Sequence, residues 1–440
     1  MTGTAPLKVG IIGLGDMGIL YAKLFAGTGL TVVACDREER YAELKADLTE
    51  VENLEVVKDG FGVARLADLL IFSVETRVVD AVVKQYGPAV KYGCIVAGQT
   101  SVKGPEIDAF DKYLPSDVNV VTCHSLHGPG VSPVGQTMVV MRHRASDEAF
   151  DTAVSTYKML GSKLVFMSCE EHDKVTADTQ VATHLGFLAM GTAWMHMGLF
   201  PWEHAAFLGG VDNVKILMAL RIYSMKSHVY SGLALLNKHA KRQALQYSKS
   251  VTALLQYMIT ENEEAFAKRI HEAGDAVFHN LSASTHEIRR ESDLLLSDEV
   301  LGEYGLGVIP ADQRTPNSHL SIIAMVDCWH QLGVNPYNNL ACQTPVFRLR
   351  LGIAQYLFKD RALLDESIRC AVYAKEIRAD DMEFHAAVRE WVTIICKGDE
   401  SAYEQQFNET RSFFEDKLVE GREASSRLIS KLITAPQPKR

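Results

Sequence analysis

The sequence predicts an α/β fold with a mostly parallel, doubly wound sheet, followed by a domain built only of helices. Three observations support this prediction. A glycine-rich turn follows the first hydrophobic run, strand and helix patterns alternate up to about residue 167, and strand patterns fade after it. At 440 residues the chain is also too long for one typical domain. We therefore expect domains at residues 1–167, 168–300 and 301–440, the last as a helical C-terminal extension.

The turn Gly13-Leu-Gly-Asp-Met-Gly18 directly follows the β-branched run 8–12 and precedes an apolar helical pattern. In this context a G-x-G-x-x-G motif binds a dinucleotide. Its first glycine permits the tight turn, its second lets a pyrophosphate approach the backbone, and its third allows close helix packing. The motif therefore predicts a Rossmann-type domain. The expected cofactor-binding residues are Gly13, Leu14, Gly15, Asp16, Met17, Gly18, Asp36, Arg37 and Ser73.

The choice of cofactor depends on the residues that follow the second expected strand, 31–35. Asp36 lies at about the distance from the glycine motif where a carboxylate reads the ribose hydroxyls of NAD. Arg37 comes next and Arg40 lies one turn later, and either guanidinium could bind the 2′-phosphate of NADP if Asp36 turns aside. The residues alone leave NAD and NADP open.

Eight hydrophobic runs are expected to form the strands of the sheet. They alternate with helical patterns, which is typical of parallel sheets, and such sheets bind ligands beyond the carboxyl ends of their strands. The runs are 8–12, 31–35, 54–57, 69–74, 94–97, 119–122, 138–141 and 163–166. Helices are expected over 170–200, 211–236, 241–273, 318–331 and 346–358, with further amphipathic helices over 360–432.

The bulk composition excludes some classes of function. A net charge of −10 leaves no broad basic surface for a nucleic acid, although a few arginines can still bind a small anion. The eight cysteines are scattered without a C-x-x-C pair, as expected for reduced thiols in the cytoplasm. We expect no signal or transit peptide. Residues 179–202 carry no charged side chain, but interrupting polar residues favour a buried helix over a membrane span.

The candidate catalytic residues follow two of the expected strands. His124 comes after the run 119–122, where an imidazole could accept a hydroxyl proton as hydride leaves the same carbon. Ser101 follows the run 94–97 and could bond both the substrate and this imidazole, or cap the helix that starts near Val102. His124 and His127 have no further ligands nearby in the sequence, so no metal site is expected.

Polar residues on the apolar helical patterns are the candidates for substrate binding. His172, Gln180 and His184 share roughly one helix face and could form a substrate-facing wall or a hydrogen-bond network between subunits. Arg221 lies in an apolar stretch, where an arginine holds an anion or forms a structural salt bridge. Lys215, in the same stretch, is the remaining candidate for substrate binding.

Several motifs together resemble the prephenate/arogenate dehydrogenase family, most of all its fungal NADP-dependent members. They are Gly-Leu-Gly-Asp-Met-Gly, Cys-Asp-Arg-Glu-Glu, Gly-Gln-Thr-Ser, His-Ser-Leu-His-Gly-Pro, Glu-Glu-His-Asp-Lys-x-Thr-Ala-Asp-Thr-Gln, Leu-Arg-Ile-Tyr-Ser and Pro-Asn-Ser-His-Leu-Ser. The resemblance to the fungal members covers almost the whole chain, whereas that to the wider family covers roughly residues 8 to 295. It implies NADP as cofactor, prephenate as substrate and a homodimer formed through the helical domain.

The resemblance also implies roles for individual residues. His124 corresponds to the family's catalytic histidine, Ser101 to a serine that hydrogen-bonds the substrate hydroxyl, and Arg221 to an arginine that binds a substrate carboxylate. His184 corresponds to the first histidine of a Ser-His-Leu-Pro-His motif, whose second histidine is replaced by Phe187. The implied reaction is the oxidative decarboxylation of prephenate to 4-hydroxyphenylpyruvate in tyrosine biosynthesis. The C-terminal helices have no assigned role.

Three alternatives are open. Arogenate differs from prephenate only by an amino group in place of a keto group, and the residues do not distinguish the two substrates. The β-hydroxyacid dehydrogenases share the glycine motif and the two-domain plan, but their lysine pattern is missing around Lys174. A regulator that binds a dinucleotide without turnover would not need His124, Ser101 and Arg221 together.

Overall fold

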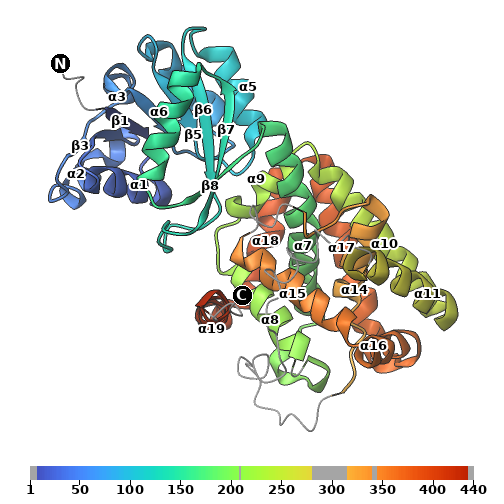
Figure 1. Ribbon diagram of the computed structural model, residues 1–440. Coiled ribbons are helices and arrows are strands. Elements are labelled where there is room, and N and C mark those ends of the chain that lie inside the picture. Colours follow the sequence, from blue (N-terminus) through green and yellow to red (C-terminus); the bar gives the residue numbers. More distant parts are fainter. Residues whose placement is uncertain (1–6, 208–209, 280–314, 339–343, 435–440) are drawn as a thin grey trace. The chain divides into compact units, whose positions relative to one another are not determined.

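The computed structural model describes residues 7–207, 210–279, 315–338 and 344–434 (Figure 1). The chain divides into two compact units, Met1–Val175 and Thr176–Arg440. The division falls within helix α7 (Cys169–His196), a little beyond the boundary expected at residue 167. The boundary expected after residue 300 lies outside the described residues.

The first unit is built on an eight-stranded sheet with the order β3-β2-β1-β4-β5-β6-β7-β8. All eight expected strands are present, and the order reverses between the parallel neighbours β1 and β4, as in a Rossmann-type sheet. The strands are β1 (Lys8–Ile12), β2 (Thr31–Cys35), β3 (Leu54–Val56), β4 (Leu69–Phe72), β5 (Ile95–Gly98), β6 (Asn119–Ser125), β7 (Thr137–Arg144) and β8 (Lys163–Phe166).

Strand β7 departs from the parallel arrangement. It pairs antiparallel with β6, with His124 opposite Val139, and it pairs parallel with β8. This pairing extends β6 as far as Ser125. The expectation that His124 follows the strand was therefore wrong, because this residue lies inside β6, near its carboxyl end.

Helices cover both faces of the sheet (Figure 1). Alternate side chains of β4 enter two separate cores, since successive residues of a strand point to opposite faces. Leu69 and Ile71 pack in the core formed with the first set of helices below, and Leu70 and Phe72 pack in the core formed with the second set. The first set is α1 (Asp16–Gly27), α2 (Tyr41–Asp47) and α6 (Asp147–Lys158), and the second is α3 (Gly60–Leu66), α4 (Val79–Tyr86) and α5 (Lys103–Tyr113).

In the described part of the second unit every regular element is a helix, as the loss of strand patterns predicts. The apolar stretch of α7 is buried, and no helix among the described residues is long and apolar enough to cross a membrane. Besides α7, the longer helices are α8 (Gly210–Tyr223), α9 (His228–Leu236), α10 (Ala240–Ile259), α11 (Glu263–Gly274), α14 (Leu320–Leu332), α15 (Pro345–Lys359), α16 (Arg361–Tyr373), α17 (Lys375–Lys397), α18 (Glu400–Phe413) and α19 (Glu415–Thr434).

Two of the expected long helices are each broken into two. The helix expected over 211–236 ends at Tyr223, and the next side chain, Ser224, bonds back to the Arg221 carbonyl oxygen at 2.7 Å. The helix expected over 241–273 is broken at Glu261, whose φ of 49° is incompatible with a right-handed helix. Asn262 then caps the following helix by accepting from the Ala265 amide.

Candidate active site

The loop after β1 has the geometry of a dinucleotide-binding turn. Gly13 has φ of +102°, and a Cβ there would overlap the Ser73 carbonyl oxygen; a Cβ on Gly18 would overlap the Gly13 carbonyl oxygen. At Gly15, by contrast, a Cβ would meet nothing within 4 Å. No side chain caps the N-terminus of α1, which begins there. The loop thus presents an open helix N-terminus that fits a pyrophosphate.

The carboxylate after β2 is already engaged by the protein. Asp36 Oδ2 accepts from the Leu14 amide at 2.7 Å and from Arg40 Nη1 at 3.2 Å, and Oδ1 accepts from the Arg37 amide at 2.7 Å. Arg40 also donates to the Leu14 carbonyl oxygen. Arg37 keeps 80% of its side chain exposed beside this pair. The carboxylate is folded against the glycine loop and neutralised, and Arg37 is left to meet a ligand phosphate.

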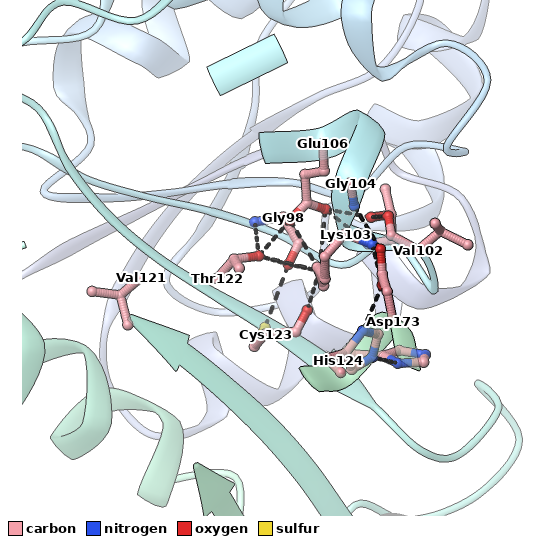
Figure 2. Close-up of polar contacts among 12 residues, drawn as sticks. Gly98, Val102, Lys103, Gly104, Glu106, Val121, Thr122, Cys123, His124 and Asp173 are labelled. Carbon is pink, nitrogen blue, oxygen red and sulfur yellow. Dashed lines mark hydrogen bonds and ion pairs between the residues drawn. The ribbon is translucent and has the colours of Figure 1, made fainter. Parts of the chain in front are cut away.

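A chain of polar contacts connects His124 to the N-terminus of α5 (Figure 2). His124 Nδ1 lies 2.8 Å from His172 Nε2, and His172 Nδ1 lies 2.9 Å from Asp173 Oδ1. Asp173 also accepts from the first two amides of α5, from Lys103 at Oδ1 and from Gly104 at Oδ2, each at 2.8 Å. One carboxylate therefore caps a helix and holds an imidazole.

The protonation states of this chain determine one tautomer. Although burial opposes ionisation, the hydrogen bonds from His172 and the two amides hold the pKa of Asp173 below its usual range, so Asp173 accepts and His172 Nδ1 donates. Burial lowers the pKa of His172, so its Nε2 carries no proton and accepts from His124 Nδ1. A neutral His124 is then left with an unprotonated Nε2, which is the atom of a general base.

His124 itself is neutral at physiological pH. Burial of the imidazole, then the neighbouring His172 and the ammonium of Lys103, hold the pKa of His124 well below its usual range. The residue is nevertheless partly exposed, so a ligand can reach it. A lowered pKa keeps the ring able to accept a proton at a pH at which an ordinary histidine would already be protonated.

A buried ion pair supports the residues around His124. The side chains of Lys103 and Glu106 are fully buried, with Nζ 2.9 Å from Oε1. Lys103 Nζ also donates to the Cys123 carbonyl oxygen at 2.7 Å, and Glu106 accepts from the Thr100 hydroxyl at 2.6 Å (Figure 2). Because these bonds join α5, the end of β6 and the loop after β5, the pair fixes the backbone on both sides of His124.

Ser101 does not cap α5. The helix begins at Lys103, with Val102 at the N-cap position, and Asp173 supplies the acceptors for its first amides. Within the described part of the chain, neither the imidazole of His124 nor any other group forms a hydrogen bond with the Ser101 hydroxyl. Its side chain is partly exposed, and the hydroxyl is therefore available to a ligand.

In the second unit, two other predicted residues occur in one cluster of rings and guanidinium groups. The His184 and Tyr230 rings meet edge to face with centroids 4.9 Å apart. Arg221 donates from Nη1 to the hydroxyls of Ser425 and Ser426 on α19, at 3.3 and 2.9 Å. Among the described residues no carboxylate pairs with Arg221, so the salt bridge considered as an alternative is not formed there.

Lys215 lies in a different environment. Its ammonium is buried and pairs with Asp212 Oδ1 at 2.8 Å, with His319 Nδ1 at 3.5 Å. An ammonium that already has a carboxylate partner has little reason to bind a second one. The geometry gives no support to the expectation that Lys215 binds the substrate.

Sequence reasoning missed the residues that support His124. His172 and Asp173 were assigned to a helical stripe, without a connection to His124, and Lys103 and Glu106 received no role. The available signal was the pair of motifs Ser-Val-Lys and Glu-Glu-His-Asp-Lys. Nothing in their spacing shows that the two motifs meet, because they are separated by two strands and a helix.

Comparison with known proteins now identifies the family. The family model described as a 6-phosphogluconate dehydrogenase C-terminal domain matches residues 181–434. A probable prephenate dehydrogenase [NADP(+)] of Schizosaccharomyces pombe is 45% identical over 97% of both chains. A prephenate dehydrogenase [NADP(+)] of Saccharomyces cerevisiae is 43% identical over 97% of this chain and 94% of its own. The chain belongs to the prephenate dehydrogenase family.

A solved structure in the same family has a similar fold. Prephenate dehydrogenase from A. aeolicus, in complex with hydroxyphenyl propionate and NAD+, aligns with a TM-score of 0.51 and 19% identity. The alignment covers 97% of that chain but 62% of this one. The shared part is a Rossmann-type domain followed by helices, as the sequence predicts, and this family member has additional chain beyond it.

The close packing at Gly98 gives a test of the buried ion pair. A Cβ on Gly98 would overlap the Glu106 carboxylate, which cannot retreat without losing Lys103 and Thr100. We expect Gly98→Ala to lower the free energy of unfolding by about 1–3 kcal/mol in urea denaturation. Gly62→Ala in α3 is the matched control, because a Cβ there meets nothing within 4 Å, and it should be neutral or stabilising. Equal effects of the two substitutions would contradict this role of Gly98.

Proposed function

We propose that this chain is an NADP-dependent prephenate dehydrogenase that converts prephenate to 4-hydroxyphenylpyruvate and CO2. The observation that carries the proposal is the contact chain from Asp173 through His172 to His124, which leaves His124 Nε2 as a base. Relatives along the full length that carry this name support the substrate and the cofactor. A homodimer through the helical unit stays a prediction, which light scattering can check.

The mechanism assigns a proton transfer to His124. Its Nε2 takes the proton of the ring hydroxyl while the C–H bond on the same ring carbon breaks, and the Ser101 hydroxyl holds the oxygen in place. Bound NADP+ supplies the acceptor for the hydride. The bond to the ring carboxylate then breaks to release CO2, its electron pair makes the ring aromatic, and His124 returns its proton to the phenol oxygen. Atoms and charge balance without a further reactant.

His172 and Asp173 act through His124 and are positioning residues. While His124 carries the proton, its Nδ1–H still donates to His172, and the negative charge of Asp173 stabilises the imidazolium across the intervening ring. Arg221 orients a carboxylate of the substrate, and its serine partners leave the positive charge available for that purpose. His184 lies beside Tyr230 in the same cluster and forms part of the surface that faces the substrate.

The direct test is the formation of NADPH, followed by absorbance, when purified protein meets prephenate and NADP+. We expect rapid turnover with NADP+ and slower turnover with NAD+. Turnover of arogenate and not of prephenate would replace the substrate but keep the enzyme class. Binding of NADP+ without turnover of either compound would overturn the proposal.

His124→Asn should lower kcat by about 10²- to 10⁴-fold, because the amide cannot accept the hydroxyl proton. The substitution retains a polar side chain of similar reach, and the residue does not contact the glycine loop. The dissociation constant of NADP+, measured by fluorescence titration, should therefore stay close to that of the wild type. A variant with nearly normal kcat would remove His124 from the role of base.

Asp173→Asn should lower kcat by about 10²-fold or more, because the amide carries no negative charge and can turn His172 into the wrong tautomer. Without the carboxylate the imidazolium of His124 is less stable, so the pKa of His124 falls further. The acid limb of the kcat–pH profile, where protonated His124 is inactive, should therefore move to lower pH. A purely structural role of Asp173 would not move this limb.

Glu171→Gln is the matched control for Asp173→Asn. It removes a carboxylate from the same turn of α7, and its amide oxygen can still accept from Ser168. We expect normal kcat and an unchanged pH profile. If both variants shift the profile equally, the effect is one of general charge and the contact with His172 is not responsible.

Arg37→Ala should raise KM for NADP+ by about 10- to 100-fold, with little change in KM for NAD+, because only NADP carries the 2′-phosphate. Initial rates with each cofactor measure this difference. Arg65→Ala, at another exposed arginine of the same unit, should leave both values unchanged. A parallel rise for NADP+ and NAD+ would assign the phosphate to a different residue.

A further inference from the structure

Arg350 is a buried cation without a counter-ion. It lies in α15 with 2% of its surface exposed. Its Nη1 donates to the Thr183 hydroxyl at 3.3 Å, its guanidinium lies 5.1 Å from the centre of the Phe187 ring, and its Nε has no acceptor. Among the described residues no carboxylate pairs with it. Burying a charge in this way is costly unless a partner arrives from outside.

The surroundings of Arg350 are positive. Burial lowers the pKa of Arg350 to about 10; Tyr230 opposes this shift and Arg221 adds to it, and the group remains charged at neutral pH. Burial, and then the nearby charge of Arg350, lower the pKa of His184 well below its usual range, so this ring is neutral. Two guanidinium groups, Arg350 and Arg221, thus act on the same tyrosine with no acidic side chain between them to offset their charge.

Other buried cations in this chain are paired. Arg269 donates from Nε and Nη2 to both oxygens of Asp327, each at 2.8 Å. Lys103 has Glu106, and Lys215 has Asp212. The fold therefore does provide carboxylates for the cations that hold its helices together. Arg350 is the exception in this comparison, and its position next to Arg221 indicates that its partner is a ligand.

We infer that Arg350 binds a carboxylate of the substrate together with Arg221, and that helices α15 and α19 complete the substrate site. The inference rests on the proposed function, because prephenate carries two carboxylates and matches a pair of guanidinium groups. It also gives a role to the C-terminal helices. Arg350 belongs to α15, and the serines that hold Arg221 belong to α19. Both helices lie beyond residue 295, where the resemblance to the wider family ends.

The contrast between Arg350 and Arg269 provides the experiment. Arg350→Met should raise KM for prephenate by about 10- to 100-fold, because a charge-assisted bond to the substrate is lost. KM for NADP+ should stay within about twofold of wild type. The Tm without ligand should be unchanged or higher, because an uncompensated buried charge is replaced by an apolar side chain of similar length. Prephenate should raise the Tm of the wild type but not that of the variant.

Arg269→Met is the matched control and should behave in the opposite way. It leaves the Asp327 carboxylate buried and unpaired, so the Tm should fall by several degrees, while KM for prephenate stays normal. Arg350→Lys keeps the charge but loses the forked geometry, and its KM should lie between those of wild type and Arg350→Met.

The outcomes separate the inference from the function on which it rests. A wild type that does not reduce NADP+ with prephenate overturns the proposed function. An active wild type with an unchanged KM in Arg350→Met overturns only the inference. A fall in Tm as large as that of Arg269→Met also overturns it, since Arg350 would then have a structural partner, for example in a second subunit.

Discussion

The carboxylate of Asp173 is the contact on which the catalytic geometry depends. It accepts two amides at the N-terminus of α5 and one imidazole N–H, so the same two oxygen atoms satisfy a helix end and orient His172. Helix α5 has no cap of its own, and its first amides favour a negative charge. The requirement to satisfy this helix end therefore keeps Asp173 ionised. An ionised Asp173 in turn determines which nitrogen of His172, and then of His124, carries a proton.

Much of the first unit could be predicted because its signals are local. Hydrophobic runs give the eight strands, and the turn between Gly13 and Gly18 gives the cofactor loop. The end of β6 could not be predicted in this way. His124 and Ser125 are polar, so the hydrophobic run ends before them, and only the pairing with β7 shows that the strand continues. The connection from His124 to His172 is a tertiary contact across 48 residues, for which the sequence holds no periodic signal.

In the helical unit the same rule succeeded at one arginine and was not applied at another. Arg221 was selected because it lies among apolar residues, and Arg350 lies in a similar stretch between Leu349 and Leu351. Periodicity alone does not decide whether Arg348 or Arg350 is the buried one. Lys215 shows the opposite error. Asp212, three residues earlier on the same helix face, already indicated a local ion pair, and the structure contains it.

Burial has opposite consequences for the two kinds of basic side chain in the proposed mechanism. An imidazole has an ordinary pKa close to neutrality, so burial and neighbouring positive charge are enough to leave His124 unprotonated and ready to act as a base. A guanidinium begins so far above neutrality that burial lowers the pKa of Arg350 only to about 10, and the charge remains. A buried arginine cannot escape its cost by losing a proton, as a histidine can. It needs an anion, and where the fold supplies none, the substrate is the group that can provide it.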